Sequence, residues 1–212
     1  MAKALLRLSL LLSVFFLVVV VALHTQPYDD SALRTLLVSS PDCALPCWQG
    51  IHPGITSGVD AIAILQDHAW VGYVRVRGDL AAGYPGTITW TWSGQQPPTL
   101  GASRAGGRLL VIDNVVQYVR LPTTLPFGDI WLSFNHPEAG RLDGPSGFAS
   151  RQEMFHQASY RGGALMVESV VVCPMQYDAL WNTPVTVELR QEMRLLPLVD
   201  YRLAQWMANA PC

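Results

Sequence analysis

The chain has 212 residues, half of them hydrophobic and only 14% charged, a composition that indicates a folded protein and excludes long disordered stretches. The formal net charge is −2, and without the two basic residues near the N-terminus, Lys3 and Arg7, 12 basic residues remain against 16 acidic ones. Because the balance is acidic and the sequence has no run of arginines, the composition disfavours nucleic acid as a partner.

The first segment is basic at Lys3 and Arg7 and then apolar from Leu8 to Leu23, broken only by Ser9 and Ser13. This order is typical of a segment that enters the export pathway with its N-terminus held in the cytoplasm. Residues 4–23 approach the length of a membrane-spanning helix. We therefore predict that residues 1–24 are either a signal anchor, which leaves the C-terminal domain outside the cell membrane, or a signal peptide cleaved near Ala22, which releases a secreted protein.

The remaining sequence is predicted to be α+β. After a spacer over residues 25–42, which includes a short helix at 31–38, the hydrophobic pattern changes twice from a helical to an alternating period. We expect two similar units, residues 43–121 and residues 122–212, each a helix packed on a three- or four-stranded antiparallel sheet. Two such units side by side bury more apolar surface than either could alone.

In the first unit, Thr56 is predicted to cap a helix that runs to about His68. Strands are expected over residues 70–77 and 87–92. The apolar runs 108–112 and 115–121 flank Asp113-Asn114, two residues that tolerate the left-handed conformation, so they predict a hairpin.

In the second unit, a helix is predicted from Phe127 to Phe134, ended by the sequence Asn-His-Pro that begins at Asn135. The glycine- and proline-rich residues 138–150 are expected to form a loop. A hairpin over residues 153–160 and 164–173, a strand over 185–190 and a C-terminal helix over 198–207 complete the unit.

All four cysteines lie on the side predicted to be exported, where disulfides persist. Three pairings of Cys43, Cys47, Cys173 and Cys212 are possible, and the sequence does not choose among them. We favour Cys43–Cys47 with Cys173–Cys212, because the first two are close in sequence. A zinc site and a redox-active pair are disfavoured, since the second close pair that zinc would require is missing and three residues, rather than two, separate Cys43 from Cys47.

No catalytic, metal-binding or cofactor motif is found, and the five histidines show no metal-ligand spacing. Three acidic residues on predicted strands, Glu153, Glu168 and Glu188, could converge in the fold. They keep open the alternative of an extracellular hydrolase that uses carboxylates brought together by the fold.

Aromatic residues provide the best candidates for binding. Trp90 and Trp92 share one strand face with Ile88, and Tyr73 lies on the strand expected next to it. If exposed, they would form a flat surface for a sugar or a peptide; if buried, they belong to the core, which the presence of Ile88 favours. Trp48, beside the close cysteine pair, is expected to shield a disulfide.

Two stretches resemble known exported proteins. The run Pro41-Asp-Cys-Ala-Leu-Pro-Cys-Trp-Gln-Gly-Ile-His-Pro-Gly-Ile-Thr56 looks like a signature of exported bacterial proteins of unknown function. Gly54-Ile-Thr at the start of a helix, followed by Leu65 and antiparallel strands, resembles BamE/SmpA-like periplasmic domains and the two-unit β-lactamase-inhibitor-protein fold. The resemblance implies a helix-on-sheet scaffold that binds proteins at or near the envelope, and these families offer no catalytic residues to transfer. The lipidated cysteine of BamE has no counterpart here, which argues against a role in outer-membrane assembly.

The sequence therefore predicts a non-catalytic, membrane-tethered module outside the cytoplasm, with a binding or envelope-structural role. The expected partners are the membrane itself, through residues 4–23, and another envelope protein or a glycan.

Overall fold

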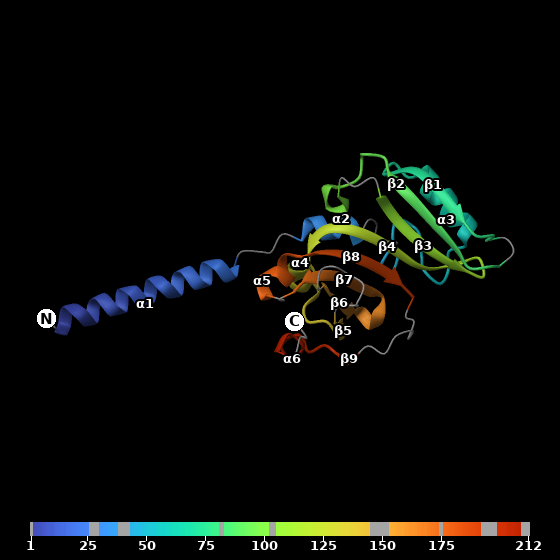
Figure 1. Ribbon diagram of the computed structural model, residues 1–212. Helices are drawn as coiled ribbons and strands as arrows, with labels where there is room; N and C mark the ends of the chain where they lie inside the picture. Colours follow the sequence, from blue (N-terminus) through green and yellow to red (C-terminus); the bar gives the residue numbers. More distant parts are fainter. Residues whose placement is uncertain are drawn as a thin grey trace.

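A single antiparallel sheet organises the chain in the computed structural model, which describes residues 2–25, 30–37, 43–80, 83–101, 105–144, 153–173, 176–191 and 199–208 (Figure 1). Within these ranges the protein is α+β, as predicted, with nine strands and six α-helices. The strand order is β1-β2-β3-β4-β8-β7-β6-β5-β9, and every pairing is antiparallel.

The strands, in chain order, are β1 (Val71–Arg77), β2 (Gly86–Trp92), β3 (Ala105–Ile112), β4 (Val115–Pro126), β5 (Ala139–Asp143), β6 (Glu153–Tyr160), β7 (Leu165–Val172), β8 (Pro184–Arg190) and β9 (Val199–Asp200). The helices are α1 (Ala2–Thr25), α2 (Ser31–Leu37), α3 (Gly58–Asp67), α4 (Phe127–Phe134), α5 (Tyr177–Asn182) and α6 (Leu203–Ala208). Two 3₁₀ turns are added, η1 (Pro98–Leu100) and η2 (Arg161–Gly163).

The local predictions with the strongest turn chemistry are confirmed. Asp113 and Asn114 adopt φ angles of 51° and 57° and join β3 to β4 as a tight hairpin. Helix α4 has the predicted bounds, and Asn135 ends it with φ 64°. The cap of α3 differs from the prediction. Ser57 caps the helix by accepting from the Asp60 N–H at 3.1 Å, while the Thr56 hydroxyl accepts from the His52 N–H in the preceding turn at 2.8 Å.

Three elements of the second half differ from the sequence-based expectation. The predicted loop over residues 138–150 contains strand β5, which pairs with β6 and β9. Helix α5 was not predicted. The C-terminal helix begins at Leu203 rather than near residue 198, because Val199 and Asp200 pair with Gly140 and Ala139 as strand β9.

The sheet and helices bury one hydrophobic core. Helix α3 contributes Ala61 and Leu65 to this core, and α4 contributes Phe127 and Ile130. Alternate strand residues, such as Ile88 on β2, meet them from the sheet. Because successive strand residues point to opposite faces, the side chains between these apolar positions form a second face that is largely polar. This second side of the sheet is called the polar face below.

The two halves of the chain occupy the two halves of the sheet. Strands β1 to β4 form one half, and β5 to β9 form the other, with β4 and β8 paired at the centre. The predicted boundary between residues 121 and 122 lies inside β4.

The N-terminal residues form the helix α1, which projects from the body of the protein (Figure 1). Its apolar side chains are exposed, with Phe15 at 67% and Phe16 at 70% of their accessible area. No helix in the part of the chain that the structure describes combines the length and hydropathy required to span a bilayer. The choice between an anchor and a cleaved signal stays a prediction.

A buried histidine makes stability depend on pH. The imidazole of His156 contacts the Ser169 hydroxyl at 3.0 Å and the Tyr201 hydroxyl at 2.7 Å, and burial lowers its pKa from 6.5 to about 4. As the pH falls, His156 is protonated in the unfolded chain before it is protonated in the folded protein. The contribution of neutral His156 to the free energy of unfolding is therefore fully present above about pH 6.5 and is lost toward pH 4. We expect the free energy of unfolding to fall by about 2–3 kcal/mol between pH 7 and pH 4.5 from this group.

Urea unfolding of the wild type and His156→Gln at both pH values measures this contribution. The variant should lose clearly less stability on acidification, because other titrating groups act equally in both proteins. Parallel pH dependences of the two proteins would show that His156 does not carry the effect.

Candidate binding groove on the polar face of the sheet

The polar face carries a groove of about 620 Å³ that crosses β1 to β4 and reaches β8. Its polar side chains are Tyr73, Arg75, Thr89, Thr91, Arg108, Arg120 and Thr186, and Trp90, Gly106, Gly107 and Pro122 complete the lining. Three arginines from three different strands thus face one open space.

Strand register explains why these arginines meet. Arg75 pairs with Thr89, Thr89 pairs with Arg108, and Arg108 pairs with Arg120, so one row of the sheet runs across four strands. The row continues from Arg120 to Glu188 on β8. Side chains in one such row share a face, and directly opposite residues have Cβ atoms about 4.5–5.5 Å apart. Arg108 and Arg120 are therefore like charges in direct opposition, a pairing that destabilises a sheet unless other charges compensate it.

Two glycines shape the floor of the groove. The Trp90 ring lies against Gly107, where a Cβ atom would overlap it, and a Cβ atom on Gly106 would overlap the Trp90 carbonyl oxygen. Only glycine permits this close approach of β3 to the indole. Trp90 thereby supports the groove although its side chain belongs to the core.

At one end of the groove, Arg120 joins two buried acids. Its guanidinium forms an ion pair with Glu168 and lies 3.7 Å from a carboxylate oxygen of Glu188. Gln157 donates to Glu168 at 2.7 Å, and Arg190 lies 3.7 Å from Glu188. Burial, and then the neighbouring Glu168 carboxylate, raise the pKa of Glu188 above its ordinary value.

The other two groove arginines have no comparable partner. Arg75 and Arg108 are exposed and form no ion pair with the residues that the structure describes. The groove therefore has a neutralised end at Arg120 and a positively charged stretch across β1 and β3.

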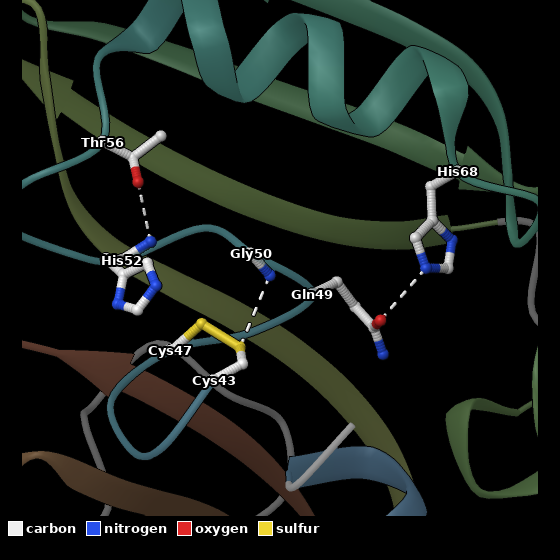
Figure 2. Close-up of a disulfide and its surroundings, with 7 residues drawn as sticks. All are labelled: Cys43, Cys47, Gln49, Gly50, His52, Thr56 and His68. Atoms are coloured by element: carbon white, nitrogen blue, oxygen red, sulfur yellow. Dashed lines mark hydrogen bonds between the residues drawn. A yellow bond between two sulfur atoms is a disulfide. The ribbon is translucent and has the colours of Figure 1, made fainter. Parts of the chain in front are cut away.

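The disulfide turn supports the groove from the core side. Figure 2 shows the bridge between Cys43 and Cys47 beside a turn in which the Gly50 N–H donates to the Cys43 sulfur at 3.4 Å. The preceding residue of the same turn, Gln49, contacts the His68 ring at 3.2 Å. Trp48, next to the bridge, is 1% exposed and stacks on Trp90 with 5.4 Å between ring centroids. The disulfide, Trp48, Trp90 and the groove floor thus form successive layers.

The residues predicted to bind separate into two groups. Trp90 and Trp92 are 3% and 8% exposed and belong to the core, so they do not form the exposed aromatic surface that was one of the two expectations. Tyr73 is 64% exposed and lines the groove. The difference follows from alternation, since Tyr73 and the tryptophans lie on opposite faces of paired strands.

The acidic residues singled out by the sequence also separate. Glu168 and Glu188 converge on Arg120, whereas Glu153 lies at the exposed start of β6, opposite Val172. Within the described ranges, no group of three histidine, cysteine or acidic side chains is arranged to hold a metal ion.

The sequence-based reasoning did not identify the three groove arginines. A signal was present in Tyr73-Val-Arg75-Val-Arg77, whose alternation puts tyrosine and both arginines on one face. What the sequence lacks is the register that adds Arg108 and Arg120 from separate strands.

The chain matches no family model, no curated protein and no solved structure. The resemblance to BamE/SmpA-like and β-lactamase-inhibitor-protein domains therefore stays a prediction, and the geometry of the groove carries the functional argument.

The cysteines provide a direct chemical test. The bridge between Cys43 and Cys47 is confirmed, and Cys173 is also disulfide-bonded, while its predicted partner Cys212 lies outside the described residues. Alkylation of the unreduced, unfolded protein should leave all four cysteines unmodified, and peptide mapping by mass spectrometry should recover a Cys43–Cys47 peptide. Four alkylated thiols, or a peptide that links Cys43 or Cys47 to Cys173, would contradict this pairing.

Proposed function

We propose that the protein is a non-catalytic binding module that works outside the cytoplasm and binds a negatively charged ligand in the groove. The observation that carries the proposal is the position of Arg75 and Arg108, which flank Thr89 in one row and form no close ion pair with the residues that the structure describes. Guanidinium groups bind carboxylates and phosphates with strong, charge-assisted hydrogen bonds.

The charge pattern of the sheet supports this assignment. Placing Arg108 directly opposite Arg120 costs folding stability. Arg120 forms ion pairs with both buried acids, whereas Arg108 interacts with Glu188 only at longer range. An anion bound over Arg75 and Arg108 would compensate the remaining positive charge of these two guanidinium groups. Features that cost stability without a structural benefit are typical of functional sites.

The proposal also covers where the protein works and which partners it binds. The basic and apolar start of the chain supports export, with α1 either retained as an anchor or removed as a signal. The two halves of the sheet are proposed to be similar helix-on-sheet units of the kind that the resemblance implies. The ligand would then belong to another envelope protein or to a glycan.

A retention experiment tests the binding function. The full chain is immobilised and exposed to detergent-solubilised cell envelopes, alongside the double variant Arg75→Glu/Arg108→Glu. We expect the wild type to retain material that elutes with salt, because exposed charge pairs are screened by salt, and we expect the double variant to lose it.

Arg77→Glu is the matched control, because Arg77 lies on β1 two residues from Arg75 and does not line the groove. It should retain the same material as the wild type. Equal retention by the wild type and the double variant would refute the groove as the binding site.

A second function is favoured by one observation. Glu168 and Glu188 contact the same guanidinium, so their carboxyl groups lie within the roughly 10 Å that two-carboxylate hydrolysis uses, and the pKa of Glu188 is raised by burial. Against it, both acids are buried, held by Arg120, and absent from the lining of the groove. Hydrolysis of nitrophenyl glycosides that is abolished in Glu188→Gln would support the hydrolase.

A further inference from the structure

We propose that the ligand of the groove is a saccharide that carries carboxylate groups, an inference that rests on the proposed binding function and names its chemical class. The groove combines arginines for carboxylates, threonine hydroxyls for sugar hydroxyls and an exposed tyrosine for the face of a sugar ring. These three chemistries lie on one surface of β1 to β4 and β8.

The arginines suit carboxylates on separate sugar rings. Arg75 on β1 and Arg108 on β3 are both paired with Thr89 on the strand between them. Their backbones are therefore two strand spacings, about 9–10 Å, apart. Two guanidinium groups at this separation can each bind one carboxylate of an extended oligosaccharide.

The hydroxyl groups of the groove suit a polyhydroxylated ligand. Thr89, Thr91 and Thr186 line it, and each hydroxyl can donate one hydrogen bond and accept two. The Thr91 hydroxyl already accepts from the Tyr73 N–H at 3.0 Å, which leaves its proton free to donate. The Tyr73 ring, 64% exposed, offers an apolar face beside these polar groups.

The same floor is poorly suited to an acidic peptide. A peptide that binds to a sheet usually adds main-chain hydrogen bonds along a free edge. The strands under the groove centre, β2 and β3, each have a neighbour on both sides, so their backbone groups are used within the sheet. A peptide added along the outer edge of β1, the end strand, would lie beside the groove and not on its floor. Recognition on the floor must therefore come from side chains, which favours a saccharide over a peptide of equal charge.

Calorimetric titration of the full chain in detergent tests the inference with three probes. Trigalacturonic acid carries three carboxylates, its carboxyl-reduced form carries none, and an end-capped Glu-Glu-Glu peptide carries three without sugar rings. We expect trigalacturonic acid to bind at least about 10-fold more tightly than either of the other probes, because only it meets the arginines, the threonines and Tyr73 together.

Variants connect this binding to the groove. Arg75→Gln and Arg108→Gln should each weaken the binding of trigalacturonic acid about 10-fold, as expected for the loss of one charge-assisted contact. Arg77→Gln should leave it unchanged. Tyr73→Ala should weaken it, whereas Tyr73→Phe should retain most of it, since the ring and not the hydroxyl is used. Unchanged circular dichroism and melting temperature establish that each variant is folded.

The arms separate this inference from the proposed function. Equal binding of the peptide and the acidic trisaccharide, or equal binding of the reduced trisaccharide, overturns the saccharide class while a groove-dependent retention of envelope material still stands. No binding of any probe, together with envelope retention unaffected by Arg75→Glu/Arg108→Glu, overturns both.

Discussion

Replacing Trp48 by alanine should lower the free energy of unfolding by about 3–5 kcal/mol, the usual cost of truncating a buried tryptophan. The side chain is 1% exposed and stacks on Trp90. It also meets the edge of Trp92 with 6.4 Å between centroids and lies 6.3 Å from the His68 ring. The cavity left by alanine would open between the disulfide turn and the groove floor, where both sides are fixed by other contacts.

Urea unfolding of Trp48→Ala and two comparison variants measures this effect. Trp48→Phe should cost clearly less, because the indole N–H has no hydrogen-bond partner within the described ranges and only packing is lost. Tyr73→Ala should change stability by no more than about 0.5 kcal/mol, since Tyr73 is an exposed side chain. A loss below about 1 kcal/mol in Trp48→Ala would mean that the aromatic layers do not hold the first half of the sheet together.

The sequence predicts the elements whose signals are local. The Asp113-Asn114 turn needs only the two residues that adopt positive φ angles, and the alternating runs on either side then become β3 and β4. Helix α4 likewise depends on its own apolar face and on Asn135 at its end. For these elements, neighbours in the chain carry enough information.

Elements that depend on distant partners are not predicted. Strand β5 was not predicted because residues 138–150 are rich in glycine and proline, which are typical of loops. Gly140 is nevertheless required in this strand, because the Gln157 carbonyl oxygen and the Tyr201 ring approach its backbone closely. Strand β9 exists only because β5 offers it an edge. A short segment with no period of its own is shaped by what it meets in the fold.

In the candidate site, too, features set by local alternation can be predicted, and features set by distant strand pairing cannot. Alternation alone places Trp90 and Trp92 on one face and Tyr73 and Arg75 on one face, but it does not say which face a helix or turn covers. The pairing of β4 with β8, which are far apart in the chain, brings Arg120 next to Glu188. No pattern within either strand predicts that neighbour, so the ion network at the end of the groove could not be foreseen.

Removing the guanidinium of Arg120, at the end of the groove, should also lower the free energy of unfolding strongly. In Arg120→Met, Glu168 loses its ion-pair partner and Glu188 keeps only Arg190 beside it, while both acids stay buried. Breaking a buried ion pair from one side typically costs about 3–5 kcal/mol, because the remaining charge is left uncompensated. Urea unfolding at pH 7 measures the loss, and an unchanged stability would show that Arg120 is dispensable to its two acids.

The double variant Arg120→Met/Glu168→Gln separates charge from packing. It removes the pair between Arg120 and Glu168 and keeps Glu188 beside Arg190, so it should recover most of the stability that Arg120→Met loses. If the double variant is as unstable as the single one, packing of the arginine stem rather than charge is responsible.

The pH dependence of Arg120→Met provides an independent check. Burial and the Glu168 charge already raise the pKa of Glu188, so the folded state takes up this proton before the unfolded state does as the pH falls. Without Arg120 the pKa should rise further, because a nearby cation that favoured the charged form is gone. The stability deficit of Arg120→Met relative to the wild type should therefore shrink as the pH is lowered from 7 to 5. A deficit that stays constant over this range would mean that the two acids are not left charged and buried when the arginine is removed.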